Sequence, residues 1–487
     1  MQASMVSAGD QIQTTKKKSP GKSEMTSEIE YTGYLSPDVL KSLPVATTVG
    51  NHDADNANYT YHFNTPNSSD LGSNGVVGGD YYFTYGNTLF MMLNTQDTNA
   101  AEHKQFMEQA IAANPNCTWR VVTLHQDIYG SAEHSNEPEI TNLRYTLVPY
   151  FEANDVDVVL TGHDHAYSRT HILEGGHKTV EYTDDEFDAE LDKDMDAGEN
   201  PATRYEAPAN ISADSKEPAD VAYLNYLNAV MDKDAVEDTE KGETVVNPDG
   251  ILYMTANSSS GSKYYDLVPR MQSYIANRWQ EDVPTYSVID VTDNTFTINT
   301  YRTDNDQKID ETFTIKKGVT EDIKSASVGN VKNQIYTGKQ IQPAIKVTLN
   351  GKTLKAGKDY TVTYTDNKNT GLAKATINGI GKYTGTQTVT FKIVPKKAVL
   401  KTVKAGKSGT ATVTIGKAGG KVSGYAIQVS TDSSFKKVTT YRTAKTTYTL
   451  KNLSKGKTYY VRVKAFTKVS DKNVYGAASK TIKVKAK

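Results

Sequence analysis

Two histidines one residue apart, His163 and His165, directly follow a short apolar segment at 157–161. This segment is rich in β-branched residues and is typical of a buried strand. Gly162 permits a sharp turn at its end, where a Cβ would clash. Both imidazoles could then point into one cavity, and neutral imidazole is the commonest protein metal ligand. The alternative interpretation is a pair of loop histidines in solvent.

Other polar side chains of the metal-ligand type stand at the ends of further predicted strands. The sequence predicts strands at 4–8, 45–49 and 120–124 and helices at 31–43, 102–113 and 143–154. Alternating strands and helices predict an α/β layered fold, which places its sites beyond strand ends. We therefore expect one donor set of carboxylate, amide and imidazole groups, suited to first-row divalent metals: Asp10, Asn51, His52, Asp53, His125, His163 and His165.

This donor set is larger than one ion needs, which favours two ions sharing Asp10 as a bridging carboxylate. Paired ions recur in phosphate-ester hydrolysis, where they activate a water and neutralise phosphate oxygens. His52 differs from the ligands because Asp53 could orient its ring and raise its pKa, which suits a general acid for a leaving alkoxide. A structural histidine is the alternative at this position.

Composition separates the chain into two chemically different parts. A chain of 487 residues is too long for a single hydrophobic core, and no apolar run in it reaches transmembrane length. The single Cys117 excludes an internal disulfide framework and a cysteine-rich zinc site. Residues 1–330 hold 23 Lys and Arg against 53 Asp and Glu, whereas residues 331–487 hold 32 against 4. Separate modules with separate partners are expected. The basic part could bind nucleic acid or an anionic polymer such as a cell-wall polysaccharide, and the alternative is a solvated β-module surface without a partner.

The remaining segments predict further elements. A hairpin is expected around Gly86-Asn87, a helix at 219–231, a strand at 250–256, and strands at 286–301 and 312–316 that complete the sheet. The acid-dense stretch at 181–196, within an insertion at about 178–248, is expected to be solvated or locally disordered. The Lys-rich stretch at 16–22 is expected to be a surface loop. Short alternating runs after about residue 319 predict two β-sandwich modules, which contain no histidine.

The ordered motifs of the first part resemble calcineurin-like metallophosphoesterases, with the purple acid phosphatase branch nearest. The motifs are Gly9-Asp10, the Gly-Asn-His-Asp at 50–53, the strand ending in His125, and Gly-His-Asp-His-Ala-Tyr-Ser-Arg at 162–169. The resemblance implies a four-layer α/β sandwich of two packed sheets flanked by helices. It implies that Asp10 bridges the ions, that Asn51, His125 and His163 hold one, and that His165 holds the other. It also marks His134 as a second candidate for substrate binding or proton donation.

Two departures from that family stand out. The purple enzymes carry an iron-binding tyrosine three residues after the bridging aspartate, where this chain has Gln13. The family's first aspartate ligand lies on an earlier strand, whereas the nine residues before Asp10 contain no acid. We therefore expect a fragment or a damaged copy that lacks its first strand and its signal peptide, with the His165 site depleted. The expected cofactors are two divalent or mixed-valence ions of Fe, Zn or Mn.

The second part resembles bacterial Ig-like repeats at 319–395 and a fibronectin type III domain at 396–487. Both imply a secreted or cell-wall-associated bacterial protein, without a membrane span or specific nucleic-acid binding. The function predicted for the whole chain is hydrolysis of phosphate monoesters by a metal-bound hydroxide attacking in line, with His52 as general acid aided by His134. The alternatives are a phosphodiesterase or nucleotidase of the same superfamily, and a catalytically impaired protein that binds cell-wall glycans.

Overall fold

The computed structural model describes residues 4–14, 23–176, 182–199, 212, 214–232, 235–238, 244–261, 263–268 and 270–487. The Lys-rich stretch at 16–22 lies outside these residues. The chain divides into two compact units, Met1–Lys317 and Gly318–Lys487. Within the described residues, no helix combines the length and the apolar character needed to cross a bilayer.

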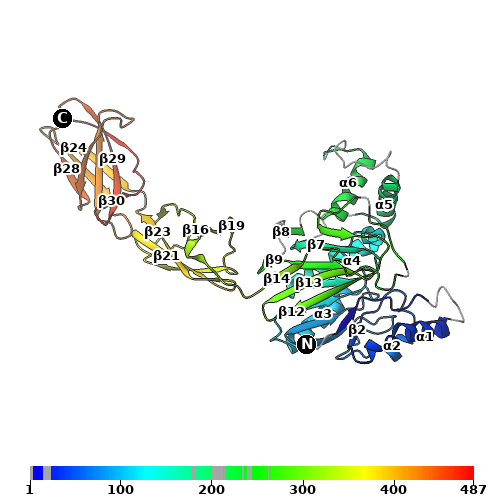
Figure 1. The fold of residues 1–487 in the computed structure, drawn as a ribbon. Coiled ribbons are helices and arrows are strands. Elements are labelled where there is room, and N and C mark those ends of the chain that lie inside the picture. The colour runs from blue at the N-terminus through cyan, green and yellow to red at the C-terminus, as the bar shows by residue number, and fades with distance from the viewer. Residues whose placement is uncertain are drawn as a thin grey trace. The chain divides into compact units, whose positions relative to one another are not determined.

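An eight-stranded mixed sheet forms the centre of the first unit (Figure 1). Its strands run in the order β11 (Ile275–Trp279), β7 (Tyr167–Leu173), β10 (Ile251–Thr255), β6 (Val158–Thr161), β5 (Trp119–Thr123), β4 (Thr88–Met92) and β3 (Tyr81–Tyr85), with β8 (Val236–Asp238) paired to β7. Strands β4, β5, β6 and β10 are parallel, so their carboxyl ends share one edge. The expected hairpin joins β3 and β4 through Gly86, whose φ of 60° suits glycine.

Side chains of the central strands alternate between two cores, because successive residues of a strand point to opposite faces. Leu89 and Val122 lie with Phe106 of α3 (Ala100–Ala113) and Leu147 of α4 (Pro138–Ala153). The neighbouring residues of each strand, such as Val121 in β5, point the other way and belong to a core that this sheet shares with a second sheet. The eight-stranded sheet is therefore buried on both faces.

The second sheet has the order β12 (Thr285–Val291), β13 (Thr295–Arg302), β14 (Phe313–Lys316) and β9 (Thr244–Val246). The sequence predicts β12, β13 and β14 but not β9, which falls in the segment expected to be an insertion, and the prediction that these strands complete the central sheet is wrong. Phe296 and Ile298 of β13 pack on the central strands. On the outer face, Tyr286 and Val288 are each 41% exposed, so the fourth, helical layer is not seen over them.

A small parallel pair, β1 (Met5–Ser7) and β2 (Val45–Thr47), precedes the central sheet in sequence. The helix predicted at 31–43 is displaced, since the structure has α1 (Ser23–Tyr34) and a 3-10 turn η1 (Asp38–Lys41). Pro37 disfavours helical backbone at the residue before it, which explains why α1 ends at Tyr34. A short helix α2 (Tyr59–His62) follows β2.

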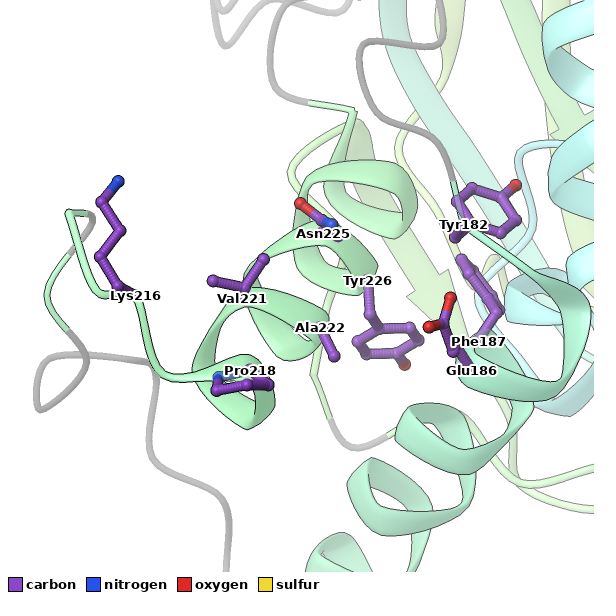
Figure 2. A pocket seen from close by; sticks show the side chains of 9 residues that line it. All are labelled: Tyr182, Glu186, Phe187, Lys216, Pro218, Val221, Ala222, Asn225 and Tyr226. Atoms are coloured by element: carbon purple, nitrogen blue, oxygen red, sulfur yellow. The ribbon is translucent and has the colours of Figure 1, made fainter.

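The acidic insertion is more ordered than its composition predicts. A helix, α5 (Asp184–Glu199), lies beside α6 (Pro218–Met231) (Figure 1). The prediction of a solvated segment overlooked Phe187 and Leu191, which the helical period brings to one face, where they pack with Tyr226. A pocket of about 330 Å³ lies between these helices. Its lining residues, shown in Figure 2, include none of the predicted site residues.

The second unit contains two all-β modules, each with its own buried core. The first comprises β15 (Glu321–Asp322), η4 (Ile323–Ser325), β16 (Ser327–Val328), β17 (Gln334–Ile335), β18 (Val347–Leu349), β19 (Lys352–Thr353), β20 (Tyr360–Thr365), β21 (Gly371–Gly379), β22 (Tyr383–Thr384) and β23 (Thr386–Val394). The second pairs a three-stranded sheet, β24 (Val399–Ala405), β25 (Ala411–Gly416) and β28 (Thr447–Leu450), with a five-stranded sheet of β27 (Thr439–Thr443), β26 (Gly424–Ser430), β29 (Thr458–Val469), β30 (Lys472–Tyr475) and β31 (Ile482–Lys485).

Candidate metal centre

Four strands deliver the predicted ligands to one place. Asp10 follows β1, Asn51 follows β2, His125 follows β5 and His163 follows β6. Asp10 and His163 have φ of 52° and 68°, a left-handed conformation that non-glycine residues seldom adopt. Such strained positions cluster at functional sites, because the surrounding structure must hold them.

Three of these side chains form a compact donor group. One ligand atom each from Asp10, His125 and His163 lies within 4.8 Å of the other two. The Nε2 atom of His125 is 3.4 Å from Oδ2 of Asp10 and 3.0 Å from Oδ1 of Asn51. The amide oxygen of Asn51 therefore joins the group, which offers two oxygens and two imidazoles to a cation. We call these four residues the donor cluster.

Hydrogen bonding on the far side of His125 tests whether the cluster fits a cation. The Nδ1 atom of His125 is 2.7 Å from the carbonyl oxygen of Ala8, which can only accept a hydrogen bond. Nδ1 must therefore carry the proton, and in the neutral ring the Nε2 lone pair faces the oxygens of Asp10 and Asn51. Such converging lone pairs repel one another unless a proton or a cation lies between them. The donor set therefore fits a first-row divalent cation.

Charges within the cluster place a positive charge among these donors. Burial lowers the pKa of His125, but the Asp10 carboxylate and the Ala8 carbonyl outweigh it and raise that pKa, so without a metal a proton lies between the two side chains, and a bound cation would replace it.

Burial lowers the pKa of His163 to about 3, and the neighbouring His125 and His134 act in the same direction. His163 is thus a neutral imidazole at ordinary pH, as a metal ligand must be. Burial raises the pKa of Asp10, but His125 and His52 outweigh it and hold that pKa well below its usual range. Asp10 is therefore an anion.

Two glycines allow the cluster to close. A Cβ on Gly50 would lie 2.1 Å from Oδ1 of Asp10, and a Cβ on Gly9 would lie 2.3 Å from Nδ1 of His125. Neither separation is possible between real atoms. The glycines at the turns after β1 and β2 thus serve the close approach of Asp10 and His125, and the sequence motifs contain them for that reason.

His52 lies at the edge of the cluster, with a different partner from the one predicted. Its backbone N–H donates to Oδ1 of Asp10 at 3.0 Å, and its ring Nδ1 is 2.7 Å from the carbonyl oxygen of Gln13. Asp53 does not orient this ring. Its carboxylate is fully buried and accepts hydrogen bonds from the Gly50 amide and the Tyr31 hydroxyl. Burial, aided by the charge of Asp10, raises the pKa of Asp53 to about 7.

His165 stands apart from the donor cluster. In the described part of the chain, the group of mutually close ligand atoms does not include it. Its Nδ1 atom is 2.8 Å from the carbonyl oxygen of Lys263. Its ring lies 4.9 Å from that of Tyr265, which also approaches His134 at 4.7 Å. Sequence reasoning missed the loop that carries Lys263 and Tyr265, since no motif marks it.

His134 lies against the cluster and is held by two acids. Its ring stacks on that of His163 at 4.6 Å, and its Nδ1 is 2.6 Å from Oε1 of Glu137. Asp164 accepts hydrogen bonds from the backbone N–H of His134 and, at 2.6 Å, from the hydroxyl of Ser135. Asp164 thereby fixes η2 (Glu133–Asn136) beneath the site. Neither acid was predicted, although Asp164 lies between the two motif histidines.

The last motif residue, Arg169, has a structural partner. Its Nε is 2.6 Å from Oδ2 of Asp310, and its Nη2 is 3.1 Å from Oδ1. The Tyr167 hydroxyl donates to the same carboxylate at 2.7 Å. Because Tyr167 and Arg169 belong to β7 while Asp310 precedes β14, this network links the two sheets beside the site.

Comparison with known proteins agrees with this architecture. Residues 5–167 match the family described as calcineurin-like phosphoesterase, and residues 400–481 match the fibronectin type III domain. An uncharacterized protein of Mycobacterium tuberculosis, from the strains CDC 1551 / Oshkosh and ATCC 25618 / H37Rv, is 26% identical over 156 residues, which are 27% of this chain. The chain spans 29% of the length of these curated relatives.

Two solved structures illustrate the similarity. A purple acid phosphatase from yellow lupin (Lupinus luteus) seeds aligns at 14% identity and a TM-score of 0.39, over 60% of this chain and 44% of that one. A fibronectin-type-III-like protein from Clostridium thermocellum aligns at 24% identity and a TM-score of 0.16, over 19% of this chain and 91% of that one.

The chain therefore carries a calcineurin-like phosphoesterase domain, followed in its second unit by a fibronectin type III domain. Both predictions from the sequence are confirmed. The Ig-like assignment of residues 319–395 stays a prediction.

Proposed function

We propose that the first unit is a metal-dependent phosphoesterase that hydrolyses phosphate monoesters. The observation that carries this proposal is the donor cluster, in which Nε2 of His125 faces the oxygens of Asp10 and Asn51 with its Nδ1 fixed by Ala8. The phosphoesterase family of residues 5–167 supports the substrate class. Bound divalent cations would attract phosphate oxygens and make a water more acidic.

We assign to His52 the role of proton donor to the leaving oxygen. The Gln13 carbonyl engages Nδ1, so Nε2 is the ring atom available to a substrate. The backbone bond from His52 to Asp10 holds this side chain at a fixed place beside the cluster. Proton donation of this kind contributes about 10²–10⁴-fold to a rate.

His134 is the second histidine that we assign to the substrate. Glu137 engages its Nδ1, and the stacked ring of His163 fixes its plane. His134 would then bind a phosphate oxygen or assist His52. In this proposal Asp53 supports the turn after β2 and takes no part in proton transfer.

A second cation would share Asp10 with the first, and among the described residues His165 would be its other ligand. With fewer donors than the first, it would bind more weakly. The predicted pair of ions thus becomes one tightly held ion and one weakly held ion.

Hydrolysis assays with matched variants test the proposal. The substrates are p-nitrophenyl phosphate, an alkyl phosphate and bis(p-nitrophenyl) phosphate, with added Mn²⁺ or Zn²⁺. We expect His163→Ala to abolish turnover, and His62→Ala to leave it unchanged, because His62 lies on α2 paired with Glu28. His52→Ala should slow the alkyl ester far more than the p-nitrophenyl ester, whose leaving group needs no proton.

Two outcomes would redirect the assignment. Faster hydrolysis of the diester than of the monoester would indicate a phosphodiesterase. Turnover that survives His163→Ala would exclude this centre as the source of activity.

The second unit supports a location outside the cytoplasm, because many cell-surface proteins share the fibronectin type III sandwich. We propose that the protein acts outside the cell or at its wall. Fractionation of the producing cells with an antibody to the second unit tests this, and a purely cytoplasmic signal would contradict it.

A further inference from the structure

On one face of the fibronectin type III module, all the charged side chains are cations. In β29, Val461, Val463 and Ala465 are fully buried, so the alternating residues must point to the opposite side of the sheet. Those residues include Arg462, Lys464 and Lys468. The core of the module therefore dictates that these three cations face outward.

Strand pairing extends this row across the sheet. Ala426 of β26 pairs with Arg442 of β27 on one side and with Lys464 of β29 on the other. Lys483 of β31 pairs with Tyr460. Six cations thus share what we call the cationic face: Arg442, Arg462, Lys464, Lys468, Lys483 and Lys485.

The module supplies no counterions for this face. Residues 396–487 hold 22 Lys and Arg against 2 acids, and the structure, which describes all of them, contains no ion pair among them. The carboxylate of Asp432 is engaged by the Ser434 hydroxyl and the Lys436 amide. Arg442 approaches only a phenol oxygen, that of Tyr475, at 3.3 Å. The charges therefore remain open to an external anion.

The spacing of the charges suits a flexible polymer. Arg462 and Lys464 are two residues apart on one strand, which is about 7 Å, and Arg442 and Lys464 are two strands apart, which is about 10 Å. A chain with one phosphate every few bonds can meet such a grid continuously. In addition, phosphate oxygens can accept two parallel hydrogen bonds from the planar guanidinium of an arginine.

Two aromatic rings near this face are already packed against other side chains, which leaves fewer rings for the base stacking by which proteins bind single-stranded nucleic acid. The guanidinium of Arg462 lies 4.0 Å from the ring centre of Phe435, and Tyr475 packs on Phe466 at 5.7 Å. We propose that the cationic face binds a linear polyol phosphate, a polymer of phosphodiester-linked polyols without bases. The module would then hold the first unit on a phosphate-bearing surface.

Binding of poly(glycerol phosphate) to the full chain tests this proposal. The binding measurement does not depend on hydrolysis by the first unit. Affinity is measured by biolayer interferometry between 50 and 300 mM NaCl. The first variant combines Arg442→Glu with Lys464→Glu. Its matched control combines Lys401→Glu with Lys404→Glu on β24 of the opposite sheet, where both lysines are exposed and the net charge changes equally. Thermal unfolding checks that both variants fold.

We expect affinity to fall with salt, as release of counterions requires. The Arg442/Lys464 variant should bind about tenfold or more weakly and with a shallower salt dependence, while the Lys401/Lys404 variant stays within about twofold of the wild type. Equal losses in both variants would overturn the proposal, since net charge alone would then explain binding. Tighter binding of single-stranded DNA than of poly(glycerol phosphate) would also overturn it.

Discussion

Replacing Asp310 with asparagine should destabilise the first unit strongly, although this residue is outside the donor cluster. Its carboxylate accepts hydrogen bonds from Tyr167, from Asn277 and twice from Arg169. Only 4% of the Asp310 side chain and 11% of the Arg169 side chain are exposed. Asp310→Asn keeps the shape but leaves a buried guanidinium without its counterion.

Breaking such a buried pair costs about 3–5 kcal/mol. In a domain of this size, each kcal/mol lowers the unfolding temperature by about 2 °C, so we expect a decrease of about 6–10 °C. Differential scanning calorimetry measures it. The control is Asp304→Asn, because Asp304 is 45% exposed beside Arg302 and such surface pairs contribute less than about 1 kcal/mol. If both variants unfold at the same temperature, the link between the sheets is unimportant and the reasoning fails.

Further predictions concern pH, the site and the insertion. Burial raises the pKa of Asp310, but its hydrogen bonds and the charge of Arg169 outweigh this and lower it. Its stabilisation is therefore complete above pH about 4 and lost as pH falls through the lower folded value, so the calorimetric difference between wild type and Asp310→Asn should shrink below pH 4. His134→Gln should reduce kcat toward p-nitrophenyl phosphate without reducing the bound metal, because His134 is outside the donor cluster; loss of metal by elemental analysis would contradict this. Phe187, 1% exposed, packs 5.1 Å from the ring of Tyr226, so Phe187→Ala should cost about 3–5 kcal/mol locally. Hydrogen exchange in α5 and α6 should then accelerate while hydrolysis is retained, and unchanged exchange would refute this role.

The sequence predicts five strands of the central sheet, β3, β4, β5, β6 and β10, because each has a local apolar or turn pattern, but it does not predict β7, β8 or β11. The β-branched run before Gly162 and the turn at Gly86-Asn87 need no long-range information to be recognised. The predicted helix at 31–43 differs from the observed α1 because the apolar pattern on which it rests runs across Pro37, which disfavours helical backbone at the residue before it. The second sheet was assigned to the first because strand pairing depends on partners distant in sequence, which single-strand patterns do not identify.

The site shows the same division between local and distant information. The donor cluster was predictable because each ligand stands at the carboxyl end of a parallel strand: His125 and His163 follow strands of the central sheet, and Asp10 and Asn51 follow the separate β1–β2 pair. The partner of His52 was not, since Asp53 is adjacent in sequence but turns into the core to meet Tyr31. Tyr265 was not predicted because only folding brings it near His134, whereas Glu137 stands three residues after His134 and is a local partner that no motif marks.

The most direct test of the account is the metal content of the purified chain and of three single variants, measured by elemental analysis. We expect at least one first-row metal ion per chain in the wild type, and loss of the tightly held ion in His163→Ala. We expect His165→Ala and the partly buried control His62→Ala, which lies outside the donor cluster, to retain that ion. A wild-type chain that binds no metal, or a His163→Ala chain that binds as much as the wild type, would contradict the central claim.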